Sequence, residues 1–126
     1  MTKTKLKVFI ADDSSFIHER LPGVLNEISG VEVIGEARDG VEALDLILKL
    51  NPDVVILDIR MPGKSGIDVL AELKKQKPEL KIIMLTNYAY PQFKQKCLEL
   101  GAAYFFEKST DFEKLYSVLQ EMSKNV

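Results

Sequence analysis

The sequence lacks three features that would indicate a secreted, membrane-bound or nucleic-acid-binding protein. Its only cysteine is Cys97, so no internal disulfide can form. No long apolar run occurs at the N-terminus or elsewhere, so we expect neither a signal segment nor a membrane span. Lys and Arg total 17 against 19 Asp and Glu, and the formal charge of -2 is too small to favour nucleic acid or a membrane surface. We therefore expect a reduced, cytoplasmic chain that meets charged partners only locally.

What is present is ordinary for a globular protein. The 126 residues are 46% hydrophobic and 29% charged, which suits one compact domain with one core. No repeat, low-complexity tract or linker interrupts the chain. We expect a single domain over residues 1–126.

Hydrophobic patterning predicts five strands, each followed by a helix. The strands are predicted at residues 6–11, 31–37, 54–57, 81–85 and 103–106, with helical spacing of apolar residues after each. The fourth helix is predicted from Pro91 to Leu100, and the fifth begins at a capping box from Thr110 to Glu113. Such alternation is typical of an α/β fold, with parallel strands joined by right-handed crossovers and helices on both faces of one sheet. The all-apolar stretch 54–57 should be its central strand.

Polar side chains follow four of the five predicted strands. Asp12 and Asp13 follow the first strand, Asp58 the third, Thr86 the fourth and Lys108 the fifth. The carboxyl ends of parallel strands lie at one edge of the sheet, where such folds bind their ligands. We therefore expect these five side chains to converge.

A cluster of three carboxylates requires a cation. Carboxylates that share one crevice repel one another and raise each other's pKa values. Oxygen ligands with no His or Cys beside them favour Mg²⁺ or Mn²⁺ over zinc, and Lys108 would balance part of the remaining charge.

The same residues have the chemistry that phosphoryl transfer needs. Asp58 stands alone after the central strand and is the natural nucleophile, whereas Asp12 and Asp13 are paired and better suited to hold an ion. Lys108 could hold phosphoryl oxygens, and Thr86 supplies a hydroxyl donor.

With these motifs the chain resembles a response-regulator receiver domain, the phosphoacceptor module of two-component signalling, over essentially its whole length. The motifs match in order: Asp12-Asp13, Asp58 followed by Met61-Pro62-Gly63, Thr86, and Lys108 seven residues after Gly101. The resemblance implies a doubly wound, flavodoxin-like (β/α)5 fold with strand order 2-1-3-4-5. No output domain is visible in the sequence.

The resemblance also implies the roles of individual residues. Asp58 would accept a phosphoryl group from the phosphohistidine of a histidine kinase or a phosphotransfer protein. Asp13, Asp58 and the main-chain carbonyl of Arg60 would bind Mg²⁺, with Asp12 acting largely through water. The domain would promote only its own phosphorylation and dephosphorylation and would not be an enzyme.

A switch is the further implication of the resemblance. Thr86 would turn toward the phosphoryl group and Phe105 on the fifth strand would change rotamer, favouring one of two existing conformations. The surface of the fourth helix, fifth strand and fifth helix would then be read by a downstream protein or output domain. We expect a monomer or weak dimer.

The sequence departs from the usual family pattern around the site. Ser109 replaces the proline that usually follows the lysine, so we predict a trans Lys108–Ser109 bond. Asn87 is bulkier than the usual residue after the threonine and should narrow access to the acyl phosphate. Arg60 and Tyr88 flank the path of the hydrolytic water in this family, and our hypothesis is that they slow self-dephosphorylation.

Two other functions are compatible with such a sheet. The first is a Mg²⁺-dependent aspartyl-phosphate phosphohydrolase, although adjacent acids after the first strand and a short chain do not suit that class. The second is a flavin-binding carrier, which two acids in the first loop would disfavour. His18 is expected to be exposed near a kinase-docking face, and Cys97 to pack in the core.

Overall fold

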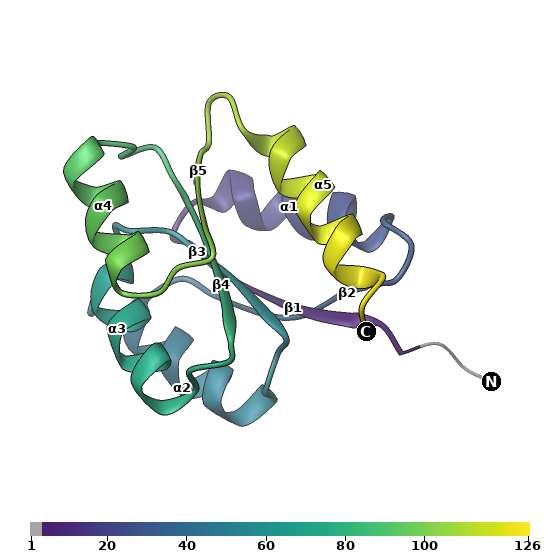
Figure 1. Cartoon of the computed structure of the whole chain (residues 1–126), viewed down its shortest axis with the longest axis horizontal. Helices are drawn as coiled ribbons and strands as arrows, with labels where there is room; N and C mark the ends of the chain where they lie inside the picture. The colour runs from purple at the N-terminus through teal and green to yellow at the C-terminus, as the bar shows by residue number, and fades with distance from the viewer. Residues whose placement is uncertain (1–3) are drawn as a thin grey trace.

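The computed structural model describes residues 4–126, which form five strands and five helices in alternation (Figure 1). Among these residues, no helix has the length and hydrophobicity that a membrane span needs. The elements are β1 (Leu6–Ala11), α1 (Ser15–Asn26), β2 (Val31–Ala37), α2 (Gly40–Leu50), β3 (Val54–Leu57), α3 (Gly66–Gln76), β4 (Lys81–Thr86), α4 (Pro91–Glu99), β5 (Tyr104–Glu107) and α5 (Phe112–Ser123).

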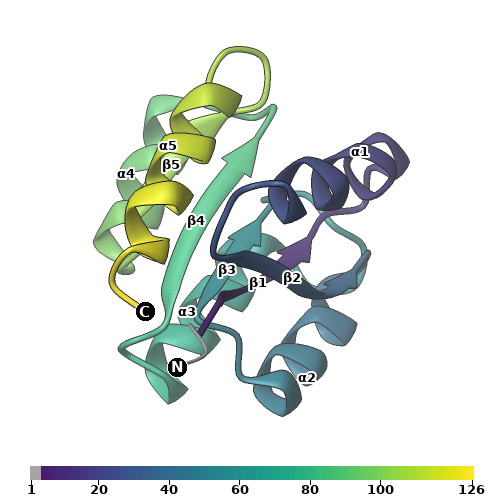
Figure 2. The same cartoon turned by 90° about the vertical axis from the view of Figure 1, so that its right-hand side faces the viewer.

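The sheet is parallel throughout, and its strand order is β2-β1-β3-β4-β5. Helices α1 and α5 cover one face, and α2, α3 and α4 cover the other (Figure 1). Figure 2 shows the same arrangement after a quarter turn. The predicted doubly wound, flavodoxin-like fold is therefore confirmed, with β3 at the centre.

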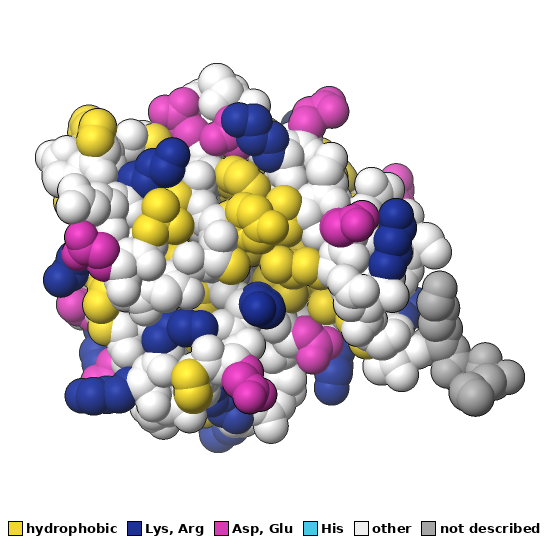
Figure 3. Space-filling model, viewed as in Figure 1, with side chains coloured by type: hydrophobic (Ala, Val, Ile, Leu, Met, Phe, Trp, Pro, Cys, Tyr) yellow, Lys and Arg dark blue, Asp and Glu magenta, His cyan; other side chains and the backbone are white. Residues whose placement is uncertain are grey.

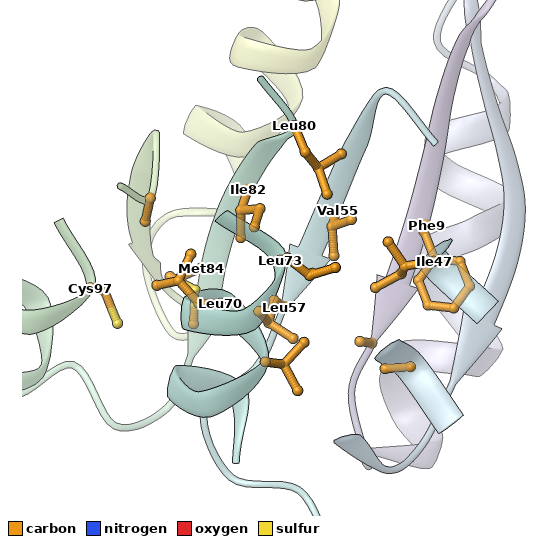
Figure 4. Close-up of a cluster of buried hydrophobic side chains, with 14 of the residues drawn as sticks. Phe9, Ile47, Val55, Leu57, Leu70, Leu73, Leu80, Ile82, Met84 and Cys97 are labelled. Carbon is orange, nitrogen blue, oxygen red and sulfur yellow. The ribbon is translucent and has the colours of Figure 1, made fainter. Parts of the chain in front are cut away.

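The central strand separates two hydrophobic clusters. Val55 and Leu57 belong to the cluster beneath α2, α3 and α4 (Figure 4), whereas Val54 and Ile56 belong to the cluster beneath α1 and α5. All four side chains are buried because helices cover both faces, which explains why the segment contains no polar residue. Cys97 is buried in the first cluster, as predicted.

Polar side chains begin three of the helices. Ser14, Asp39 and Ser65 each accept a hydrogen bond from the main-chain N–H three residues later, at the starts of α1, α2 and α3. Asn51, with φ 53°, ends α2 in the left-handed conformation. These caps orient the helices that follow the loops at the carboxyl edge of the sheet.

The predicted capping box at the start of α5 is wrong. The residue before the helix is Asp111, with φ -112°, and no side chain caps the first turn. The Thr110 hydroxyl instead donates to the Glu107 carboxylate at 3.2 Å, and Asp111 Oδ2 accepts from the Glu107 N–H at 2.9 Å. The Thr110 and Asp111 side chains thus close the β5–α5 turn onto Glu107, where β5 ends one residue later than predicted.

The packing predicts that two Leu→Ala substitutions differ greatly in their effect on the free energy of unfolding. Leu73 of α3 is fully buried, whereas Leu98 of α4 is 43% exposed. Leu73→Ala should lower the free energy of unfolding by about 2–5 kcal/mol, because it removes core contacts and leaves a cavity. Leu98→Ala should change it by about 0.5 kcal/mol or less. Urea denaturation measures both, and equal losses would contradict the assigned core.

Candidate functional site

Hydrogen bonds to its main chain and to its side chain hold Asp58 at the end of the central strand. Its N–H donates to the Ala11 carbonyl of β1 at 2.9 Å. Its side chain is 5% exposed; Oδ1 accepts from the Ile59 N–H at 2.7 Å, and Oδ2 accepts from Lys108 Nζ at 3.0 Å. The carboxylate is therefore oriented before any ligand binds.

The two acids after β1 lie beside it. The Asp12 N–H donates to the Ala37 carbonyl at 3.0 Å, which ties the end of β1 to β2, and Asp12 Oδ1 accepts from the Ser14 N–H at 2.8 Å. Asp13 is exposed, whereas Asp12 is buried. Asp12, Asp13 and Asp58 each offer one carboxylate oxygen within 4.8 Å of the others. The predicted acidic cluster thus forms.

Lys108 bridges the two buried acids. Its Nζ lies 2.8 Å from Asp12 Oδ2 and 3.0 Å from Asp58 Oδ2, and its main-chain N–H donates to the Thr86 carbonyl at 3.0 Å. Burial by itself would lower the pKa of Lys108, but the hydrogen bonds and charges of the two aspartates outweigh burial and raise it. The amine is therefore protonated in the folded protein at neutral pH.

The charge of the cluster fits a divalent cation. Burial, followed by the neighbouring charge of Asp58, raises the pKa of Asp12 even though Lys108 opposes the shift. Within the described part of the chain Lys108 contacts Asp12 and Asp58 but forms no ion pair with Asp13, so ionisation of all three carboxylates would leave the cluster with net negative charge. The donors are oxygen atoms alone, which suit Mg²⁺ or Mn²⁺. Asp12, Asp13 and Asp58 are therefore the residues that could hold such an ion.

Thr86 and Phe105, the two predicted switch residues, lie on neighbouring strands in separate environments. Thr86 is fully buried at the end of β4, and its hydroxyl accepts from the Tyr88 N–H at 3.0 Å. Among the described residues no hydrogen bond joins it to Asp58. Phe105 pairs with Met84 across the strands and is partly buried against the cluster beneath α2, α3 and α4. The Lys108–Ser109 peptide is trans, as predicted, since residues 4–126 contain no cis bond.

Arg60 and Tyr88 meet across the mouth of the site. The Arg60 guanidinium carbon lies 4.1 Å from the centre of the Tyr88 ring, which is cation–π geometry. The stack joins the loop after β3 to the loop after β4. On one side of the cluster an open pocket of about 470 Å³ is lined in part by Asp13 and Arg60. A second pocket, of about 230 Å³, is lined in part by Asn87 and Lys108.

His18 is not the exposed residue that we expected. Its side chain is 7% exposed, with Nε2 2.5 Å from the Asp12 carbonyl oxygen and Nδ1 2.5 Å from Glu36 Oε1. It thereby links α1 to the ends of β1 and β2. The sequence signal for this contact is Glu36, a charged residue near the end of β2, beside Ile10 of β1.

Comparison with known proteins identifies this arrangement. The family described as "Response regulator receiver domain" matches residues 8–120. The chain belongs to this family. It is thus a receiver domain of two-component response regulators, and aspartate phosphorylation and Mg²⁺ binding are general features of such domains. The phosphohydrolase alternative is not favoured.

Curated relatives of this receiver domain include regulators and an enzyme. The chain is 36% identical over 119 residues to the "Uncharacterized transcriptional regulatory protein YvfU" of Bacillus subtilis, covering 94% of this chain and 60% of that protein. It is 38% identical over 110 residues to a "Protein-glutamate methylesterase/protein-glutamine glutaminase" of Pyrococcus abyssi, covering 86% of this chain and 30% of that protein. The chain therefore spans less than two thirds of either relative.

Solved structures match the receiver domain over almost its full length. The signal receiver domain of the putative response regulator NarL from Mycobacterium tuberculosis has a TM-score of 0.87 and 30% identity, covering 98% of this chain and 99% of that one. A chain in the CheX-CheY-BeF3-Mg complex from Borrelia burgdorferi has a TM-score of 0.84 and 31% identity, covering 98% of this chain and 91% of that one.

The buried position of Asp12 predicts how stability depends on pH. Its folded pKa is raised above the unfolded value near 3.8, so its contribution is fully present below that value and is lost as pH rises through the folded pKa. Without divalent cations, Asp12→Asn should gain stability relative to the unaltered protein as pH rises from 4 to 7. Denaturant titrations in a chelating buffer measure the difference, and a difference that does not vary with pH would contradict the assignment.

Proposed function

We propose that this receiver domain accepts a phosphoryl group on Asp58 from the phosphohistidine of a histidine kinase or phosphotransfer protein. One observation carries the proposal: the Asp58 carboxylate lies at the end of the central strand, oriented by Ile59 N–H and Lys108 Nζ, within the cluster formed with Asp12 and Asp13. The nucleophile, the acidic ligands and the balancing cation that the chemistry needs are therefore in one place.

In the transfer, an Asp58 carboxylate oxygen forms the new bond to phosphorus as the phosphorus–nitrogen bond to the donor histidine breaks. Lys108 Nζ, already beside Asp58, would bind an oxygen of the transferred group. Mg²⁺ held by Asp13, Asp58 and the Arg60 carbonyl, with Asp12 acting through water, would supply further positive charge to the phosphoryl oxygens. Mn²⁺ fits the same oxygen donors.

The domain is proposed to be a signalling phosphoacceptor and not an enzyme. The Asp58 carboxylate is both the nucleophile and the group that retains the phosphoryl group, so each transfer consumes the acceptor. Release then depends on water reaching the acyl phosphate. Arg60 lines an open pocket with Asp13 and stacks on Tyr88, and Asn87 lines another pocket with Lys108, so the bulk of these three side chains should hinder water and lengthen the phosphorylated lifetime.

The output would be read from α4, β5 and α5. Thr86 ends β4 and Phe105 lies on the neighbouring strand β5. The proposed switch couples a movement of the Thr86 hydroxyl toward the phosphoryl group to a change of the Phe105 rotamer. Figure 3 shows hydrophobic side chains gathered in the middle of this face. Tyr104 is 40% exposed there and stacks on Phe106 with ring centres 5.5 Å apart. Exposed aromatic residues favour a protein partner.

The partner is proposed to be a downstream protein or an output domain. The Borrelia structure named above is of a complex with CheX, and other relatives are named as transcriptional regulators, which supports both kinds. The formal charge of -2 supports a protein partner over direct contact with nucleic acid or membrane. A monomer or weak dimer remains the proposed state. The single buried cysteine is consistent with a cytoplasmic location.

Labelling at Asp58 tests the proposal directly. With Mg²⁺ and a small acyl-phosphate donor, the protein should gain one phosphoryl group, detected as a mass increase in the intact protein. Asp58→Asn removes the nucleophile with little change in shape and should abolish the gain. Asp53→Asn, which alters an exposed acid before the start of β3, at the opposite end of the strand from Asp58, should not. Turnover of diverse phosphate esters with no group retained on Asp58 would instead support the phosphohydrolase.

The stack of Arg60 on Tyr88 predicts the lifetime of the phosphorylated state. A cation–π contact at an exposed site is worth about 0.5–1 kcal/mol, so replacing both residues with Ala should speed loss of phosphate by about two- to fivefold. Tyr88→Phe keeps a ring for Arg60 and should stay close to the original rate. The decay of the phosphorylated mass after removal of the donor gives the rates. Unchanged decay in the double variant would show that the stack does not limit hydrolysis.

A further inference from the structure

We propose that Gly66 and Gly40 are positioning residues for the phosphorylation site, because close backbone contacts at these glycines fix the two ends of the loop 59–65. The inference rests on the proposed role of Asp58 and its acidic neighbours. It goes beyond that role by assigning the geometry of the site to residues that carry no side chain and touch no ligand.

Gly66 lies directly against the peptide that follows Asp58. A Cβ atom at Gly66 would stand 1.8 Å from the Asp58 carbonyl oxygen, 2.7 Å from its carbonyl carbon and 3.0 Å from Ile59 Cα. The Gly66 N–H also donates to the Ile59 carbonyl at 2.7 Å. All of these neighbours are main-chain atoms, so no change of side-chain rotamer could make room for a methyl group. The first turn of α3 can approach the end of β3 only because residue 66 is glycine.

The close contact at Gly66 affects the Asp58 carboxylate through one rigid group, the peptide between Asp58 and Ile59. The Asp58 carbonyl and the Ile59 N–H belong to the same planar peptide. That N–H donates to Asp58 Oδ1 at 2.7 Å, while the Asp58 N–H is held by Ala11 of β1 at 2.9 Å. Displacing the peptide by the more than 1 Å that a methyl group needs would therefore move the donor that orients Oδ1.

Gly40 holds the other end of the loop. A Cβ atom there would stand 2.0 Å from the Lys64 carbonyl oxygen and 2.6 Å from its carbonyl carbon. The Gly40 N–H donates to the Pro62 carbonyl at 3.0 Å, and the Lys64 N–H donates to the same oxygen at 3.0 Å. The start of α2 thus presses on the loop from one side as α3 does from the other. Arg60, whose carbonyl is the proposed metal ligand, lies between the two contacts.

The chain contains two glycines that serve as matched controls. The atoms nearest to a Cβ at Gly35 of β2 would be side-chain atoms, of the partly exposed Leu50 at 2.8 Å and of the fully buried Phe9 ring at 2.9 Å. Gly35→Ala should therefore destabilise the protein without moving the site. At Gly23 of α1 a Cβ atom would meet nothing within 4 Å, so Gly23→Ala should be harmless or stabilising.

The test compares four Gly→Ala variants of the full chain, at positions 66, 40, 35 and 23. Mg²⁺ affinity is measured by calorimetric titration, the rate of labelling by an acyl-phosphate donor by mass, and stability by urea. Gly66→Ala and Gly40→Ala should weaken Mg²⁺ binding by about 10- to 100-fold, the range for lost support of metal ligands, and should slow labelling. Gly35→Ala should lose stability but bind Mg²⁺ like the unaltered protein.

A purely structural role makes a different prediction. Folded Gly66→Ala protein that binds Mg²⁺ and labels normally would overturn the inference, as would a parallel loss of Mg²⁺ affinity in Gly35→Ala. If Gly66→Ala does not fold, Gly40→Ala decides, because its methyl group meets Lys64 and not Asp58. The amide NMR signal of Ile59 adds a local readout, since it should shift in Gly66→Ala and not in Gly35→Ala. Absence of Mg²⁺ binding and labelling in the unaltered protein would instead contradict the proposed function.

Discussion

One ammonium group makes the close approach of two buried carboxylates tolerable. Lys108 lies within 3.0 Å of both Asp12 and Asp58, at the edge of the sheet where water is largely excluded. Without this cation the two acids would repel each other in a medium that screens charge poorly. The ends of three strands depend on it, since β1 carries Asp12, β3 carries Asp58 and the loop after β5 carries Lys108. The site is therefore a property of the whole sheet edge and not of any single loop.

The two buried carboxylates, Asp12 and Asp58, also show a conflict between stability and function. Burial raises the pKa of Asp12, which means that its ionised form is held at a cost when only Lys108 compensates. A more stable sheet edge would carry fewer acids, but it could not gather positive charge for a phosphoryl group. Such a cost is expected where a protein binds a highly charged ligand, because the ligand completes the electrostatic balance.

Much of the fold and site could be predicted from the sequence because both rest on local patterns. The apolar segment 54–57 indicated a strand covered on both faces, and parallel strands bring the residues after their ends together. Asp12, Asp13, Asp58 and Lys108 were found in this way. The buried position of His18 could not be predicted in this way. Helical periodicity shows which residues share a face of α1, but it does not show that the His18 ring reaches the Asp12 carbonyl at the end of β1. The backbone contacts of Gly66 and Gly40 were missed for a related reason: sequence patterns describe side chains, and these contacts exist where side chains are absent.

The hydrogen bond from the Tyr88 N–H to the Thr86 hydroxyl joins two residues with different proposed roles, Thr86 in the switch and Tyr88 in the lifetime of the phosphorylated state. Any rotation of Thr86 must either give up this bond or carry the Tyr88 main chain with it, and the Tyr88 ring bears on Arg60 at the mouth of the site. If Thr86 and Tyr88 have the roles proposed above, the lifetime of the phosphorylated state and the response of the switch depend on one hydrogen-bonded pair of residues. A substitution at Tyr88 that changes the lifetime would then also change how readily Thr86 moves.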